Sequence, residues 1–273
     1  MSSSLSRKSS KNLLPPNHSA GIALVSVLWL LLLLSGLAAT VAYIARVEAL
    51  LTRRAFDLAR AQAAADAAIV NTISRLSDEQ PDRRPQPGVP LSWQFDGFDT
   101  TAVVTLEAGR IDLNLAGDEL LRAFLQTQGI SADGASSLLE ELRLHPLITV
   151  GELGQIPQWR EQNLACWMQA FTVYSGRPDV AVADAAPDVL AAVHWMRAHS
   201  PGDSNGPLSE ITQKPSTDRS VLGEVIRVHS TATVAEVSTS SEWIGRLTGD
   251  AARPTLTMRW DHGSQAPPAP CSR

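Results

Sequence analysis

The stretch that decides the fold runs from Gly21 to Ala45 and reads GIALVSVLWLLLLLSGLAATVAYIA, 25 residues without a charged side chain. As a helix it is about 37 Å long, more than the roughly 30 Å of hydrocarbon in a bilayer. We therefore predict a transmembrane segment over residues 22–45. Neither glycine nor proline occurs from Leu37 to Gln80, and apolar residues keep a helical spacing there. One helix of about 55 residues is expected, with an amphipathic second half over residues 46–80.

Two other interpretations of the apolar stretch are possible in principle. A cleaved secretory signal is one, because Arg7, Lys8 and Lys11 precede the stretch, and a buried helix of a soluble protein is the other. The stretch is longer than the 7–15 apolar residues of a signal peptide, and no clear cleavage site ends it. Few globular helices are apolar all round over such a length. A retained membrane anchor is favoured, although the flanking basic residues do not fix its orientation.

The composition restricts the function of the remaining chain. The protein has 273 residues, 23 Lys and Arg, 28 Asp and Glu, and a net charge of -5, so no overall basic surface for nucleic acid is indicated. No phosphate-binding loop, dinucleotide fingerprint, nucleophile elbow or zinc-protease motif occurs. The six histidines are scattered and are interpreted as surface or capping residues. We expect a protein that is not an enzyme and has no dedicated metal site.

Beyond the long helix, the pattern predicts a sheet that is interrupted by helices. Prolines between Pro81 and Pro90 end the helix, and Asp96-Gly97 marks a hairpin. The expected β-runs are Leu91–Phe98, Thr101–Leu106, Gly223–Val234, Ser238–Leu247 and Pro254–Trp260. They assign residues 81–111 and 201–260 to the sheet, with a loop over Ser200–Ser220 and a tail over residues 261–273.

Residues 112–200 are predicted to form a mainly helical insertion. Its expected elements are a helix from Gly117-Asp118 to Gly129, one capped by Ser131, a short one capped by Thr149, a helix over Gln158–Ala170, a strand over Phe171–Tyr174 and a helix over Pro187–Ala198. The fold class is therefore α+β: a long N-terminal helix, an antiparallel sheet and a large helical insertion.

This layout, joined to Gly21-Ile22-Ala23-Leu24-Val25, resembles the type IV pilin-like proteins. More narrowly, it is similar to the K-type minor pseudopilins of bacterial type II secretion systems. The similarity covers nearly the whole chain from Gly21 to about His262. The stretches that carry it are Gly109–Asn114 (GRIDLN), Thr149–Pro157 (TVGELGQIP), Ala185–Ala192 (AAPDVLAA) and Glu224–Val228 (EVIRV).

The resemblance implies processing at the start of the long helix. Residues 1–21 would be a leader that a prepilin peptidase removes after Gly21, and the same enzyme would methylate Ile22. The fifth mature residue, a glutamate in most of these proteins, is Ser26. That glutamate neutralises the terminal ammonium of a neighbouring subunit within lipid, where an unpaired charge is costly. Without it, the chain suits one end of a filament, although Ser26 is also a small polar residue that a membrane helix tolerates.

The resemblance further implies the partners and the location. K-type subunits cap a pseudopilus tip with two other minor pseudopilins, above a filament of the major pseudopilin, and thereby initiate assembly for protein export. The protein would be a single-pass inner-membrane protein with its C-terminal domain in the periplasm. Removal of the leader leaves 20 basic and 28 acidic residues, so the exported part is more acidic than the full chain.

Calcium and a disulfide are less well supported by the sequence. Many family members carry an acidic, calcium-associated loop in the insertion, whereas here Leu142–Pro146 leads directly to the next helix. Asp203-Ser204-Asn205-Gly206 with Glu210 offers oxygen ligands, but the spacing departs from a calcium-binding loop and favours a plain turn. A further departure from the family concerns the leader: the basic residue that these proteins often carry just before the cleavage-site glycine is absent before Gly21. Cys166 and Cys271 either pair in an oxidising periplasm or stay single, with Cys166 acting as a small apolar residue.

One alternative function comes from a different class. Leu153-Gly154-Gln155-Ile156-Pro157 also resembles the turn of a helix-hairpin-helix unit, which would make the chain a membrane-anchored nucleic-acid-binding protein of the DNA-uptake type. Residues 112–200 hold eleven acidic residues and five arginines. Since a phosphate-binding module should be basic, nucleic acid is not expected as a partner.

Overall fold

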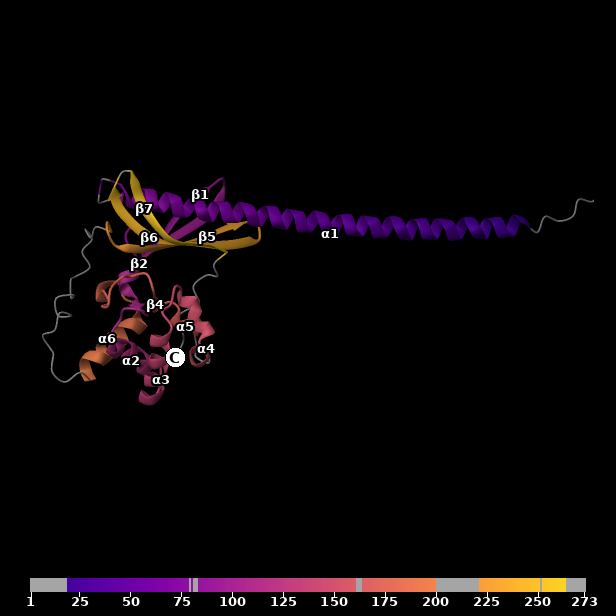
Figure 1. The fold of residues 1–273 in the computed structure, drawn as a ribbon. Coiled ribbons are helices and arrows are strands. Elements are labelled where there is room, and N and C mark those ends of the chain that lie inside the picture. Colours follow the sequence, from indigo (N-terminus) through magenta and orange to yellow (C-terminus); the bar gives the residue numbers. More distant parts are fainter. Residues whose placement is uncertain are drawn as a thin grey trace, which may run out of the picture. The chain divides into compact units, whose positions relative to one another are not determined.

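A computed structural model describes residues 19–78, 80, 83–160, 164–199, 221–250 and 252–263. Two compact units are distinguished, residues 1–55 and residues 56–273, and each is considered by itself. Helix α1, Ser19–Leu76, passes from the first unit into the second and is one uninterrupted helix of 58 residues (Figure 1). The long helix that the sequence predicts is confirmed, although it ends four residues before Gln80.

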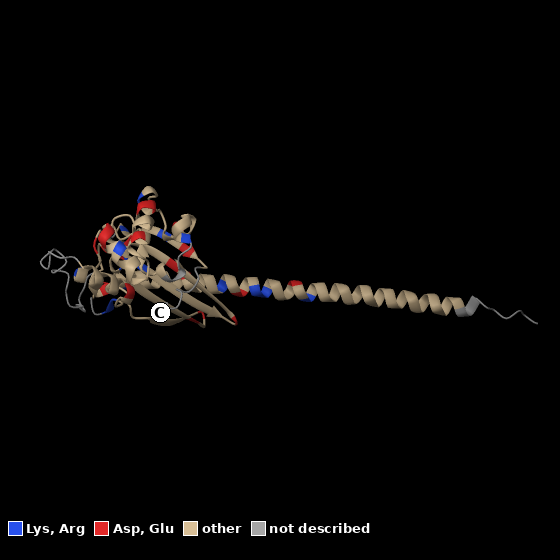
Figure 2. Ribbon diagram, turned by 90° about the horizontal axis from the view of Figure 1, so that it is seen from below, with Lys and Arg blue, Asp and Glu red and all other residues tan. Residues whose placement is uncertain are grey.

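The first half of α1 is apolar and exposed. Every side chain described from Ile22 to Phe56 is solvent-exposed, and Figure 2 shows a long stretch of this helix without acidic or basic residues. The segment Ile22–Leu76 is long and apolar enough to cross a membrane, with a mean hydropathy of 2.5 in its most apolar window. An N-terminal helix of this kind fits a single-pass membrane anchor.

The second unit contains a five-stranded antiparallel sheet with the order β1-β2-β5-β6-β7. The strands are β1 Leu91–Phe95, β2 Phe98–Leu106, β5 Val225–Val234, β6 Val237–Asp250 and β7 Arg253–His262. The first hairpin turns at Asp96-Gly97 as predicted, and both residues have positive φ, 52° and 80°. Such a pair forms the type I′ turn that joins two neighbouring antiparallel strands tightly.

The insertion lies between two strands that are neighbours in the sheet. Leu106 ends β2 and pairs with Ile226 near the start of β5, so the chain leaves and re-enters the sheet at adjacent positions. The elements between them are η2 Glu107–Gly109, β3 Ile111–Asp112, α2 Asp118–Thr127, α3 Ala132–Leu144, η3 Val150–Gln155, α4 Pro157–Arg160, α5 Leu164–Trp167, β4 Phe171–Thr172, η4 Val182–Asp184 and α6 Pro187–His199. Strands β3 and β4 form a separate parallel pair.

Each face of the interrupted sheet has a different neighbour. The last turns of α1 pack on one face through aliphatic residues. Ala68, Ile69 and Leu76 are buried there against strand residues such as Val228, and Ala65 is buried against Ala232. The insertion has a core of its own, built around the rings of Phe124, Trp159, Trp167 and Phe171. Together these elements form the α+β fold that the sequence predicts.

The helix predicted over Gln158–Ala170 is confirmed only in part. The structure has two four-residue helices, α4 and α5, on either side of residues 161–163, which lie outside the description, and the helical part ends at Trp167. The rings of Trp159 and Trp167 meet edge to face in the insertion core, with centroids 6.2 Å apart. In one straight helix these positions would be separated by about 12 Å along the axis. Two short helices allow both indoles to enter the same core.

Three smaller predictions also need correction. Thr149 does not cap a helix with its side chain; instead Glu152 accepts a hydrogen bond from the Ile148 amide at 2.9 Å, and the segment is the 3₁₀ helix η3. The strand expected over Phe171–Tyr174 is limited to Phe171–Thr172. The tail does not begin at residue 261, because β7 continues to His262. Ser131 does cap its helix, by accepting from the Gly134 amide.

Candidate functional site

The start of α1 carries the predicted processing and assembly residues. Gly21 lies within the helix, and Ile22 follows with 74% of its surface exposed. Ser26 is exposed as well, and its hydroxyl donates to the Ala23 carbonyl at 2.9 Å. One helical face gathers Ile22, Val25, Ser26, Trp29, Leu30 and Leu33. Cleavage and methylation remain predictions, since these positions show only that the segment is helical and accessible.

No carboxylate lies near Ser26 along the helix. The first acidic residue after Ile22 is Glu48, which is 22 residues beyond Ser26 in the chain. At 1.5 Å per residue the two positions are about 33 Å apart along the axis. The serine hydroxyl carries no charge and already donates to its own backbone. The apolar half of α1 therefore offers no anion to the ammonium group of another chain.

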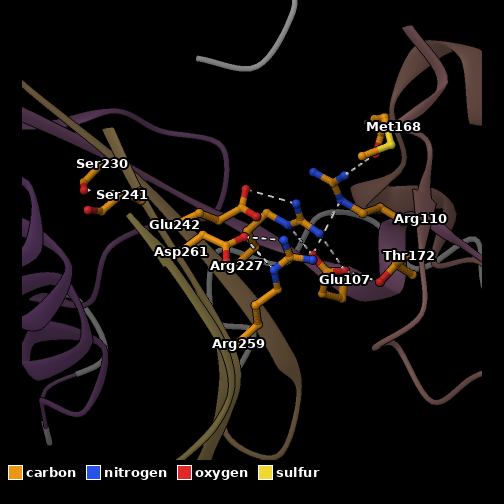
Figure 3. A network of polar contacts seen from close by, with 10 residues as sticks. All are labelled: Glu107, Arg110, Met168, Thr172, Arg227, Ser230, Ser241, Glu242, Arg259 and Asp261. Carbon is orange, nitrogen blue, oxygen red and sulfur yellow. Dashed lines mark hydrogen bonds and ion pairs between the residues drawn. The ribbon is translucent and has the colours of Figure 1, made fainter. Parts of the chain in front are cut away.

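A buried ionic network joins the sheet to the insertion (Figure 3). Its centre is Glu107, which is fully buried in η2 directly after β2. Arg227 on β5 donates to both carboxylate oxygens, from Nε to Oε1 at 2.6 Å and from Nη2 to Oε2 at 3.3 Å. The Thr172 hydroxyl on β4 donates to Oε2 as well. One carboxylate thus holds together three segments that are far apart in the sequence.

The network continues across the sheet. Arg227 also donates from Nη1 to Glu242 on β6 at 3.0 Å, and Arg259 pairs with Asp261 on β7. Burial disfavours the charged form of Glu107, but the charges of Arg227 and Arg110 and the hydrogen bonds outweigh it and hold its pKa below the usual value. Burial likewise disfavours the charge on Arg227, yet both carboxylates raise its pKa. The charged state of this cluster is therefore the stable one in the folded protein.

The turn that carries Glu107 is fixed by a close backbone contact. The whole of η2 is buried, and the Ala181 amide donates to the Ala108 carbonyl at 2.7 Å. A Cβ atom at Gly109 would overlap with the carbonyl group of Asp184 in η4. Glycine is needed here because the two backbones approach each other so closely. The tight turn brings the side chain of Arg110 to the same side of the chain as that of Glu107, three residues earlier.

The GRIDLN stretch that contributes to the family resemblance organises the insertion. Asp112 is buried and accepts from the amides of Asn114 and Leu115 through Oδ1, and from the Ser175 hydroxyl through Oδ2. The Asn114 amide group bonds both backbone groups of Leu147. These contacts hold β3, which follows Glu107 in the chain, against the loops that contain Leu147 and Ser175. The conspicuous stretch is thus explained by structure and needs no ligand.

Several predicted sites fall outside the described residues. They are the leader before Ser19, the oxygen-rich loop from Asp203 to Glu210, and Cys271; the side chain of Cys166 also lies outside the description. Within the ranges that are described, no group of three or more His, Cys, Asp and Glu side chains could hold a metal ion. The pairing of Cys166 with Cys271 and the binding of calcium therefore stay sequence-based predictions.

The helix-hairpin-helix-like segment forms η3 and α4. Leu153 is buried in the insertion core, and Ile156 is almost fully covered. Glu152 accepts hydrogen bonds from the Ile148 amide and the Thr149 hydroxyl directly before this segment. An acidic side chain at this place repels a phosphate.

Comparison with known proteins identifies the fold. No family model matches the chain, and no curated protein matches its sequence. Among solved structures, it is similar to a chain in the crystal structure of the GspK-GspI-GspJ complex from the type 2 secretion system of enterotoxigenic Escherichia coli. The alignment covers 78% of this chain and 99% of that chain, with a TM-score of 0.53 and 12% identity. A likeness at this identity shows a shared fold.

Proposed function

We propose that this protein is a structural minor pseudopilin of a type II secretion system that caps the tip of the pseudopilus and initiates its assembly. The observation that carries the proposal is Ser26, whose hydroxyl bonds its own helix in a segment that has no carboxylate before Glu48. The pseudopilin-like fold of the chain supports it independently. The protein would act by binding other subunits and not by catalysis.

The physical argument concerns charge in a membrane. A processed pilin-like chain carries an ammonium group at its new N-terminus, and an unpaired charge in hydrocarbon is expensive. A subunit with a carboxylate at the fifth mature position can pair with the ammonium of the subunit beside it. This chain has Ser26 there, so it can have its own ammonium paired but cannot pair another. A subunit that receives this ion pair from one neighbour but cannot offer it to another fits the terminal position of a filament.

The proposal includes a sequence of partners. A prepilin peptidase cuts after Gly21 and methylates Ile22; the apolar half of α1 then leaves the inner membrane to pack against sister helices. Two other minor pseudopilins complete the tip, and the major pseudopilin adds below it. The globular unit lies in the periplasm, where export across the outer membrane begins. The exposed apolar face of α1, including Trp29 and Leu33, supplies the packing surface.

Replacement of Ser26 tests the end-cap role. Ser26→Glu restores a carboxylate and should let the chain occupy internal positions, which lowers secretion and raises the number of copies per filament. Ser26→Gln is the matched control, because it has the same size without the charge and should behave as the native chain. The measurements are the secretion of an endogenous substrate and the stoichiometry of pseudopili isolated from the native host. Unchanged secretion and stoichiometry with Ser26→Glu would remove the support for a cap.

Processing is tested by the mass of the mature protein. Gly21→Leu should leave the full precursor uncut and abolish copurification with the two sister pseudopilins. The same exchange at Gly36, where nothing lies within 4 Å of the added Cβ, should leave processing intact. In the native host, intact-mass analysis should find a chain that begins at Ile22 and carries one methyl group. A native chain that still begins at Met1 contradicts the proposal.

The nucleic-acid alternative has its own test. A gel shift at low salt with duplex and single-stranded DNA, performed on the full chain in detergent, should show no tight complex. Tight binding that weakens steeply with salt would instead favour the DNA-uptake type of function.

A further inference from the structure

A cleft of about 420 Å³ lies within the second unit, between the sheet and the insertion. Its sheet wall comes from β2, β5, β6 and β7, on the face opposite to α1; its other wall includes Arg110, η3 residues Val150 and Gly151, and the segment around Met168. A volume of this size is typical of pockets for small ligands. Several members of the ionic network line the cleft, including Arg227 and Glu242, and Figure 3 shows how these side chains lie.

Two of the three arginines that line the cleft are paired with carboxylates at close range. Arg227 bonds both Glu107 and Glu242, and Arg259 bonds Asp261 at 2.5 Å. Each of these guanidinium groups faces a carboxylate at close range. Their charges are therefore neutralised within the protein.

Arg110 is different. Only 16% of its side chain is exposed, yet its contacts among the described residues are long: Nη1 lies 3.5 Å from the Met168 carbonyl, and Nε lies 3.6 Å from Glu107. A guanidinium group has five N–H donors, and most of those of Arg110 have no acceptor among the residues that the structure describes. Burial, together with the charge of Arg227, lowers the pKa of Arg110 to about 10. It remains protonated at neutral pH and would gain from a further anion.

A second polar group in the cleft also lacks a partner. His229 lines the sheet wall, and its Nε2 atom is buried without a hydrogen bond within the described structure. Burial lowers the pKa of this imidazole, so the ring is neutral at pH 7. A neutral imidazole can carry its proton on Nε2 and donate it to a ligand. A buried polar atom that is left unpaired costs free energy, which a bound acceptor would recover.

We propose that this cleft binds a carboxylate group, carried by a small acid or by a short acidic peptide segment, with Arg110 as its main partner. A carboxylate matches the planar fork of the guanidinium group and accepts two parallel hydrogen bonds from it. One cation has capacity left, while Glu242 and Asp261 stand nearby, so a singly charged group suits the site better than a phosphate. Val103, Val150 and Ile244 would cover the aliphatic part of the ligand.

Thermal unfolding of the full-length chain in detergent, followed by tryptophan fluorescence, tests the proposal with matched probes. Glutarate is compared with neutral glutaramide, and the peptide acetyl-Ala-Glu-Ala-amide is compared with its Gln analogue. A ligand that binds only the folded protein raises the midpoint in a saturable manner. We expect at least one acidic probe to do so, and both neutral probes to have no effect.

Two variants locate the site. Arg110→Gln should weaken binding of the acidic probe at least tenfold. Gly151→Trp should block the cleft without touching the ionic network, because Gly151 is exposed and a Cβ there meets only the Thr149 hydroxyl at 3.8 Å. Gly117→Trp is the matched control: it is another exposed glycine of the insertion, outside the cleft lining, with nothing within 4 Å of its Cβ. This control should bind as the native chain does.

Each outcome decides between binding and its absence. A response to the peptide alone means that the cleft recognises a polypeptide, and a response to glutarate as well means that the carboxylate suffices. The proposal is overturned if neither acidic probe shifts the midpoint, if the neutral probes shift it equally, or if Gly151→Trp responds as strongly as Gly117→Trp. None of these outcomes depends on whether the chain caps a filament.

Discussion

At the scale of the residue, the most informative feature is a buried ion pair that no local pattern indicates. Glu107 and Arg227 are 120 positions apart; Glu107 follows one ordinary β-run of the sequence, and Arg227 lies within another. They meet because β2 and β5 are neighbours, with the whole insertion between them. A charged residue in an amphipathic strand is normally solvated, so the sequence could not distinguish this pair from surface charges. Only the strand order shows that the network exists.

Removing Arg227 should be strongly destabilising. Arg227→Met leaves Glu107 buried without its closest cation, which costs about 3–5 kcal/mol of the free energy of unfolding. Adding Glu107→Gln removes the stranded charge and should recover part of that loss. Arg60→Ala, which breaks an exposed pair with Asp96, should cost about 1 kcal/mol. Urea unfolding measures all four proteins; equal costs for Arg227→Met and the double variant would show that Glu107 is not the group left uncompensated.

Gly109 offers a test of backbone proximity. Gly109→Ala forces a Cβ into the Asp184 carbonyl, and backbone cannot move aside as a flexible side chain can. We expect a loss of about 1–3 kcal/mol, typical of overpacking. Gly117→Ala is the control, since its Cβ would meet nothing within 4 Å and its φ is -64°. If both variants unfold at the same urea concentration, η2 and η4 are not packed as described.

At the scale of the element, regular stretches were predictable and crowded ones were not. The long helix follows from an apolar period without glycine or proline, and the first hairpin follows from Asp96-Gly97, whose positive φ values only a few residue types adopt. The prediction of one continuous helix after Pro157 was less successful, because the packing of Trp159 against Trp167 in the core outweighs the helical pattern of the sequence. Local propensity decides where few contacts compete, and the core decides elsewhere.

The close approach of α1 to the sheet depends on alanine. Ala65 is fully buried, and its carbonyl accepts a hydrogen bond from the Ser230 hydroxyl on β5 at 2.8 Å. Ala65→Leu should therefore push helix and strand apart and cost about 1–3 kcal/mol. Ala63→Leu, on the exposed side of the same helix turn, should be close to neutral. Circular dichroism during urea unfolding compares the two; a neutral Ala65→Leu would mean that this helix face is not packed on β5.

At the scale of the whole molecule, the second unit has two apolar cores with a polar boundary between them. One core lies between α1 and the sheet, and the other lies inside the insertion. The ionic network and the cleft occupy the boundary on the remaining sheet face. The sequence indicated an insertion and a sheet, and it placed Gly21, Ile22 and Ser26 by resemblance. Arg110 lies in the GRIDLN stretch that carries the resemblance, but nothing in the sequence marks it or His229 as a ligand group, because both acquire that role only where the two parts meet.

The pH dependence of folding should report this boundary. Burial lowers the pKa of His229; the Glu242 charge on β6 opposes this and the Arg227 charge on β5 adds to it, with Arg110, Arg259 and Asp261 also lining the cleft. Between the folded pKa and the unfolded value of about 6.5, the unfolded chain binds more protons, so the free energy of unfolding falls as the pH falls through this range. Below the folded pKa the loss stops growing.

Urea unfolding of the full chain in detergent at pH 7.5 and pH 5.5 measures this effect. The native chain should lose more stability between the two pH values than His229→Gln, in which the titrating ring is absent. His194→Gln, an exposed histidine on α6, is the control and should keep the native pH dependence. Because all other titrating groups are shared, the difference between the native chain and His229→Gln isolates His229. Equal losses in the native chain and in His229→Gln would mean that the imidazole binds protons equally well in the folded and unfolded chains, and that it is not desolvated as the structure indicates.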